Sequence, residues 1–138
     1  MKYIGIDYGK KRIGVAVSDE AGQFALPKEV LANDEKLVER ISFLVKENKA
    51  SAVVIGESKD YKGKYNLIME KVAPFKKELE TLGIKVIFEP EFMTSFAAQR
   101  FQGKNTLHDS SAAALILQSF LDKENTKADH SSGTVGVR

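Results

Sequence analysis

Three carboxylates stand at the predicted ends of strands and helices and could together bind a metal ion. Asp7 closes an apolar β-rich run, where aspartate is equally common as a turn former. Glu91 follows the predicted strand 84–88, and Asp109 precedes a helical pattern in which aspartate ordinarily serves as the N-cap. Three hard oxygen ligands in one cleft suit Mg²⁺ or Mn²⁺. The combination therefore predicts a divalent-metal site for phosphoryl transfer, in which one ion activates water and a second stabilises the leaving oxygen.

Histidine, serine and cysteine do not form an alternative catalytic centre. His108 lies beside Asp109 and His130 lies near the C-terminal end, and neither has a second histidine at ligand spacing. Ser110 and Ser111 have no partner arrangement that would activate them as nucleophiles. Cysteine is absent, which excludes disulfides and thiolate metal ligands.

A basic segment interleaved with tyrosine could bind nucleic acid. Between residues 59 and 65, Lys62 and Lys64 could contact phosphates and Tyr61 could stack on an unpaired base. A solvated lysine-rich loop is an equally good interpretation. The formal net charge of +2 does not by itself indicate nucleic acid, and lysine outnumbers arginine, which favours backbone contacts over base reading.

The first part of the chain is predicted to form antiparallel strands. Residues 2–8, 12–19 and 23–31 are β-rich runs joined by short turns, and short connections require antiparallel neighbours. Pro27 lacks an N–H donor, so the third strand should lie at an edge of the sheet.

The rest of the chain alternates helices and strands. In order, the pattern predicts a helix over 34–48 capped by Asn33 or Asp34, a buried strand over 51–56, a helix from Ile68 to Leu82 kinked or restarted near Pro74, a strand over 84–88, a short helix from Thr94 or Ser95 to Phe101, and a helix from Asp109 to Lys123. Strands separated by helices become parallel. We therefore expect an α/β fold, a five-stranded mixed sheet with helices on both faces, and a site at the carboxyl ends of its strands.

The length of 138 residues suits one domain. We expect that domain to span residues 1–124 and a loose tail to span 125–138, where the sequence becomes small, polar and aperiodic. No apolar run is long enough for a membrane helix, and the opening residues lack the features of a secretory signal. A cytoplasmic location is expected.

Three motifs resemble the YqgF family of Holliday-junction-resolvase-like and pre-16S rRNA processing nucleases. They are the opening GIDYGKKRIGVAVSD, the closing DSSAAALILQSFLD and, between them, PEFMTSFAAQRF, which matches in position the family's acidic DERxTT-type segment. In that segment Glu91 falls on the family glutamate, and Thr94 and Ser95 fall on its paired hydroxyls. The resemblance covers residues 1–122 and implies an RNase-H-like fold and a divalent-metal nuclease for structured nucleic acid, which in bacteria trims the small-subunit rRNA precursor.

The resemblance implies that Asp7, Glu91 and Asp109 form the acidic triad. The chain departs from the family pattern at Pro90 and Phe92, where aspartate and arginine are usual, and in the sequence GES after the strand 51–56. This last departure introduces Glu57, a candidate fourth metal ligand. The candidate contacts to substrate are Lys10, Lys11, Arg12, Tyr61, Lys62, Lys64, Thr94 and Arg100.

Several functional alternatives remain open from the sequence. The resemblance favours the 5′ end of precursor 16S rRNA as the substrate and leaves branched DNA as the alternative. A branched-DNA resolvase would need a two-fold dimer. The sequence shows no clear dimer face, and we expect a monomer or a weak homodimer. The altered acidic segment also allows a relative that binds nucleic acid without turnover. A D-x-G turn occurs in sugar kinases and actin-like ATPases too, but those proteins need two such domains and this chain has one.

Overall fold

The computed structural model describes residues 1–59, 68–92 and 108–131, with side chains described over 1–57, 68–90 and 110–126. In chain order, the elements are β1 (Lys2–Tyr8), β2 (Arg12–Ser18), β3 (Ala25–Ala32), α1 (Leu37–Asn48), β4 (Ala50–Lys59), α2 (Met69–Thr81), β5 (Val86–Phe92) and α4 (His108–Ser131).

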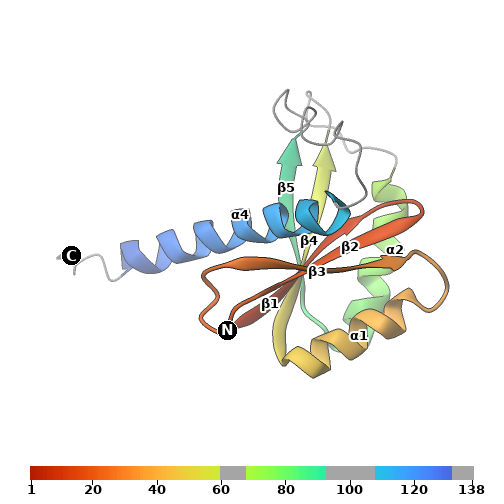
Figure 1. Cartoon of the computed structure of the whole chain (residues 1–138), viewed down its shortest axis with the longest axis horizontal. Coiled ribbons are helices and arrows are strands. Elements are labelled where there is room, and N and C mark those ends of the chain that lie inside the picture. Colours follow the sequence, from red (N-terminus) through yellow and green to blue (C-terminus); the bar gives the residue numbers. More distant parts are fainter. Residues whose placement is uncertain (60–67, 93–107, 132–138) are drawn as a thin grey trace.

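The strands form one five-stranded mixed sheet in the order β3-β2-β1-β4-β5 (Figure 1). The first three strands pair antiparallel, whereas β4 is parallel to both β1 and β5. This confirms the predicted topology and places β3, which contains Pro27, at an edge. The register slips at β3 between the partners of Val15 and Ala16, so this edge carries both a bulge and a proline.

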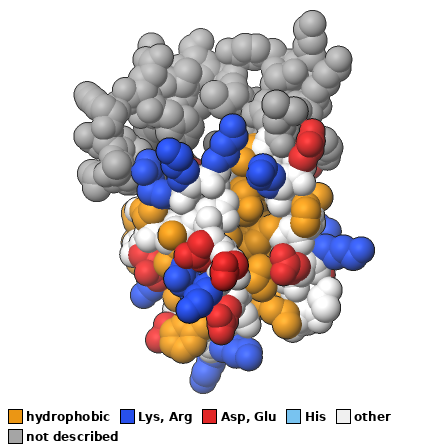
Figure 2. All heavy atoms as spheres, turned by 90° about the vertical axis from the view of Figure 1, so that its right-hand side faces the viewer, with side chains coloured by type: hydrophobic (Ala, Val, Ile, Leu, Met, Phe, Trp, Pro, Cys, Tyr) orange, Lys and Arg blue, Asp and Glu red, His pale blue; other side chains and the backbone are white. Residues whose placement is uncertain are grey.

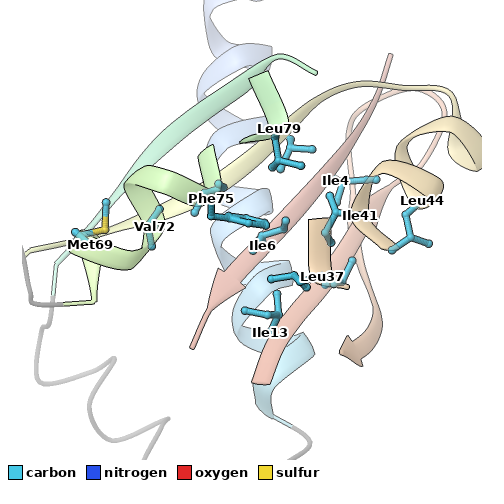
Figure 3. Close-up of a cluster of buried hydrophobic side chains, with 13 residues drawn as sticks. Ile4, Ile6, Ile13, Leu37, Ile41, Leu44, Met69, Val72, Phe75 and Leu79 are labelled. Atoms are coloured by element: carbon cyan, nitrogen blue, oxygen red, sulfur yellow. The ribbon is translucent and has the colours of Figure 1, made fainter. Parts of the chain in front are cut away.

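One face of the sheet is covered by α1 and α2. Their apolar positions recur at helical spacing and meet every second residue of the strands (Figure 3). Ile4 and Ile6 of β1 point toward this layer, where the Phe75 side chain of α2 lies against Ile6. The fully buried members of the layer are Ile4, Ile6, Ile13, Val15, Ile41, Val53, Ile55 and Leu79.

The other face is covered by α4. Its stripe Ala113, Ile116, Leu117, Phe120 and Leu121 packs on the small or branched side chains that the strands present there, including Ala16 and Val54. The Tyr3 ring contacts the Phe120 ring at 5.1 Å in an edge-on arrangement. Helices therefore lie on both faces, as predicted from the sequence, and the inward positions of α4 are those that its periodicity indicates.

The start of α1 depends on a turn before the helix. The predicted cap, Asp34, lies ahead of the first helical residue, Leu37, and its Oδ1 accepts the Lys36 N–H at 3.0 Å. That backbone donor, with Arg40 alongside, lowers the pKa of the Asp34 carboxyl below its usual value. Asp34 therefore caps a turn that leads into the helix, rather than the helix itself.

Three other predicted features differ from the structure. The helix α2 is continuous through Pro74 instead of restarting there, and Leu82 beyond its end is exposed. The strand β5 continues to Phe92 rather than ending at residue 88, and it is an edge strand, where Pro90 is tolerated. The helix α4 continues to Ser131 rather than ending near Lys123, because the first glycine after it is Gly133.

Among the described helices, none is both long enough and apolar enough to cross a bilayer; α4 has the length but carries charged residues along it.

Candidate active site

Asp7 lies at the carboxyl end of the central strand β1, half-buried and opposite Gly14 of β2. It shares a strand face with Tyr3 and Gly5, two and four residues before it. Tyr3 contacts Phe120, and Gly5 lies beneath Leu117 and the Ala113 carbonyl. Residues later in β1 therefore contact residues nearer to the start of α4. One further strand period brings Asp7 beside the first turn of that helix.

Asp109 is the second residue of α4. Its backbone therefore lies at the helix end that β1 approaches, whereas its side chain is outside the described part. Free N–H groups and the helix dipole make the first turn of a helix favourable for negative charge. The structure thus brings the backbone of one predicted ligand, Asp109, toward the strand end that carries another, Asp7.

Glu91, the third predicted ligand, lies inside β5 and not beyond it. In the parallel ladder, Gly56 pairs with Glu89, Glu57 with Pro90 and Ser58 with Glu91. Since Ile6 of β1 pairs with Ile55, the next step of that register aligns Asp7 with Gly56. Asp7, Gly56 and Glu89 therefore lie side by side across the three strands. Glu91 lies two residues, or one strand period, beyond Glu89 toward the carboxyl edge, and β4 lies between Glu91 and Asp7. Its side chain is outside the described part.

Glu89 has a role that sequence reasoning missed. Its side chain is 4% exposed and its Oε2 accepts the Ser119 hydroxyl at 2.8 Å and the Lys123 ammonium at 2.6 Å, both on α4. This carboxylate joins β5 to the helix. The spacing of Ser119 and Lys123, one helical turn apart, is the signal in the sequence that could have indicated a shared partner.

Glu57 does not join Asp7 on one face of the sheet. Val53 and Ile55 of β4 belong to the layer under α1 and α2, and the two-residue period places Glu57 with them, whereas Val54 faces α4. Glu57 is buried at 8% exposure and has an interaction partner within the protein. The strand period therefore favours a structural role for Glu57 over the predicted fourth ligand.

The turn after Asp7 presents the predicted basic group Lys10, Lys11 and Arg12, all exposed. Asn33, just after β3, fixes this turn: its Nδ2 donates to the Gly9 carbonyl at 2.8 Å, and its backbone N–H donates to the Lys11 carbonyl at 3.0 Å. The turn projects on the side of the molecule that Figure 2 shows, where Lys and Arg side chains gather in the upper part of the described surface.

The other predicted substrate contacts, Tyr61, Lys62, Lys64, Thr94 and Arg100, lie outside the described residues. So does the predicted short helix after Thr94. Among the described side chains, which do not include those of Glu91 and Asp109, no three carboxylates or histidines cluster closely enough to hold a metal ion.

Two solved structures have similar folds. Thermus thermophilus RuvC in complex with a Holliday junction aligns with a TM-score of 0.56 and 16% identity, covering 90% of this chain and 95% of RuvC. The fowlpox virus Holliday junction resolvase aligns with a TM-score of 0.55 and 14% identity, covering 89% and 99%. At this identity the likeness concerns the fold, and it confirms the RNase-H-like fold.

Sequence relatives match nearly the whole chain. A Sulfurihydrogenibium sp. protein named "Putative pre-16S rRNA nuclease" is 37% identical over 131 residues, covering 88% of this chain and 90% of the relative. A Caldanaerobacter subterraneus protein of the same name is 35% identical over 139 residues, covering 90% and 98%. The family model RuvX, described as Holliday junction resolvase, matches residues 1–123. The resemblance found in the sequence is thereby confirmed, and the chain belongs to the RuvX (YqgF) family.

Proposed function

We propose that this protein is a divalent-metal-dependent nuclease that hydrolyses phosphodiester bonds in structured nucleic acid, with Asp7, Glu91 and Asp109 as its metal-binding carboxylates. The observation that carries the proposal is the position of Asp7. It lies half-buried at the carboxyl end of the central strand, on the face covered by α4, which has Asp109 as its second residue. Family membership and the names of the relatives support nuclease activity.

The residues present fit Mg²⁺ or Mn²⁺ by their chemistry. The proposed donors are all carboxylates, which these hard ions prefer, and the chain has no cysteine to favour a softer metal. Bound there, the metal would supply an activated water and a counter-charge for the leaving oxygen. The chain's own contribution is to place the carboxylates on β1, β5 and α4, and to present Lys10 and Lys11 from a fixed turn for the phosphate backbone.

The proposed substrate is the 5′ end of precursor 16S rRNA, cleaved in the cytoplasm by a monomer or a weak homodimer. The names of the sequence relatives favour this substrate. Branched DNA is the second candidate because the family model is described as Holliday junction resolvase. A resolvase must cut two strands related by symmetry, so this alternative requires a two-fold dimer.

One experiment separates these possibilities. Purified protein is incubated with precursor 16S rRNA and with a four-way DNA junction, with Mg²⁺, with Mn²⁺ and with EDTA. We expect metal-dependent cleavage of the RNA near the mature 5′ end. Cleavage of the junction alone, by a dimer, would favour the resolvase. Binding of either substrate without cleavage in any metal would identify a non-catalytic relative and contradict the proposal.

The two glutamates of β5 should have separable effects. Glu91→Gln removes a proposed metal ligand, so we expect cleavage at saturating Mg²⁺ to fall about 100-fold or more with little change in the free energy of unfolding. Glu89→Gln keeps an oxygen acceptor for Ser119 and Lys123 but loses the charge, so stability should fall by about 1 kcal/mol and cleavage should fall less than in Glu91→Gln. A larger loss of cleavage for Glu89→Gln would show that the register of ligands is wrong.

The basic segment near residue 62 should bind phosphates. Replacing Lys62 and Lys64 by glutamine is expected to weaken binding similarly across sequences and to lower the salt slope of binding by about 1 to 1.5, since each contacted phosphate of a single strand contributes roughly 0.7. The control makes the same replacement at Lys46 and Lys49. Both are exposed, Lys46 in the last turn of α1 and Lys49 just before β4, and the salt slope should stay unchanged. If the variant at Lys62 and Lys64 kept the wild-type salt slope, the substrate would have to bind elsewhere, and the turn at Lys10 and Lys11 would become the candidate surface.

A further inference from the structure

The proposed mechanism does not use the buried carboxylate of Glu89. Glu89 of β5 is 4% exposed at its side chain, and Ser119 and Lys123 both donate to its Oε2, at 2.8 and 2.6 Å. Burying a carboxylate is costly unless a counter-charge and hydrogen bonds compensate for the lost water. Lys123, itself 55% exposed, supplies that charge from the helix surface. Such a costly arrangement in the strand that carries Glu91 calls for a role.

The end of β5 is poorly held by its backbone. This strand lies at the edge of the sheet, so β4 is its single hydrogen-bonding neighbour among the described strands. Pro90 and the glutamates on either side of it have low strand propensity. In this register the backbone nitrogen of Pro90 faces the open edge, so its missing N–H costs no bond to β4. Backbone pairing alone would therefore leave the last residues of β5 free to fray from β4.

The side-chain contacts of Glu89 supply a second restraint at this point. Ser119 and Lys123 are one turn apart on α4. This helix packs on the sheet face toward which Glu89 points, and it begins beside Asp7. A bond from β5 to α4 therefore ties the edge strand to the helix that carries Asp109. The three residues Glu89, Ser119 and Lys123 are here called the β5–α4 bracket.

We propose that the β5–α4 bracket is a positioning device that holds the carboxyl end of β5, and with it Glu91, in fixed relation to α4. Glu89 and Lys123 act through the strand and touch neither metal nor substrate. The consequence for metal binding rests on the proposed function, in which Glu91 is a ligand. The consequence for the strand itself does not, because it depends on the contacts alone.

The test uses the full chain and compares Lys123→Met with Lys123→Arg. Lys123→Met leaves the buried Glu89 carboxylate without its counter-charge, whereas Lys123→Arg keeps the cation. Amide hydrogen exchange is followed in peptides covering residues 86–92 and 37–48. We expect Lys123→Met to raise exchange in 86–92 about tenfold while leaving 37–48 unchanged, and Lys123→Arg to restore most of the protection. Mn²⁺ affinity, measured by electron paramagnetic resonance, should fall about tenfold in Lys123→Met and recover in Lys123→Arg.

A matched control breaks a different ion pair. Arg40 contacts Asp34 at 3.0 Å, and both side chains are about two-fifths exposed, at 39% and 45%. Arg40→Met should change neither β5 exchange nor Mn²⁺ affinity. Equal exchange increases across the molecule, or none in 86–92, would overturn the bracket. A local increase with unchanged Mn²⁺ affinity would overturn its role in placing Glu91. If the wild type binds no Mn²⁺, the metal site fails, and exchange alone still decides whether the bracket holds the strand.

Discussion

Asp7→Asn is expected to abolish metal-dependent cleavage while leaving the fold intact. The substitution keeps the size and polarity of the side chain at the end of β1 but removes the negative charge that a divalent ion requires. Loss of several kcal/mol of transition-state stabilisation corresponds to a fall of about 100-fold or more in rate. Packing of β1 depends on Ile4, Gly5 and Ile6, which are unchanged. Without metal, the free energy of unfolding should stay equal or rise, because clustered carboxylates repel each other.

Thermal unfolding with and without Mn²⁺ gives a second measurement of the same prediction. Ligand that binds only the folded state raises its stability, so the wild type should melt at higher temperature in Mn²⁺, and Asp7→Asn should lose most of that increase. Asp19→Asn is the matched control. Asp19 lies in the β2–β3 turn, where its Oδ1 accepts the N–H groups of Gln23 and Phe24 at 2.8 and 3.2 Å. The Asp19→Asn variant should keep both wild-type cleavage and the increase in melting temperature in Mn²⁺. Wild-type cleavage by Asp7→Asn would remove Asp7 from the mechanism.

The sheet could be predicted from the sequence because its signals are local. Alternating and continuous apolar runs mark the strands, helical spacing marks α1, α2 and the apolar part of α4, and short turns determine which strands are antiparallel. The proline in β3 correctly indicated an edge. All of these follow from backbone geometry acting over a few residues.

The extent of β5 could not be predicted because it depends on distant partners. Glu89, Pro90 and Glu91 have low strand propensity, so the sequence ends the strand before them. In the structure, β4 pairs with these residues through Gly56, Glu57 and Ser58, and α4 binds Glu89 from 30 and 34 residues away. Tertiary contacts thus override local propensity.

The candidate site was partly predictable for the same reason. The residue types and the family motifs indicate Asp7, Glu91 and Asp109, and the strand-end position of Asp7 follows from the apolar run before it. The residue type alone does not show toward which face of the sheet a side chain points. Glu57 and Glu89 are both acidic and both close to a predicted strand end, yet one shares a face with the α1 and α2 layer and the other binds α4. Only the register of β4 and β5 separates them.

Gly5→Ala adds one methyl group to β1. We expect it to destabilise the protein more than a methyl group added anywhere else in the described part of this strand. A Cβ at this position would lie 2.6 Å from the Leu117 Cβ and 3.0 Å from the Ala113 carbonyl oxygen. Both atoms are fixed to the backbone of α4, so no change of side-chain rotamer relieves the overlap, and the helix itself must move. Overpacking of this kind costs typically 1–3 kcal/mol, and here, in the middle of the central strand, we expect about 3 kcal/mol or more.

The same displacement should reach the site, since α4 begins one turn before Ala113 with Asp109 in its first turn. We therefore expect Gly5→Ala to lower both the melting temperature and, at temperatures where the variant is still folded, the affinity for Mn²⁺. Gly83→Ala is the matched control. Its Cβ would meet nothing within 4 Å, but its φ of +85° strains any L side chain, so it should cost about 1–2 kcal/mol without affecting metal binding. If both variants lost stability but Gly5→Ala kept wild-type Mn²⁺ affinity, the position of α4 on β1 would not determine the geometry of the metal site.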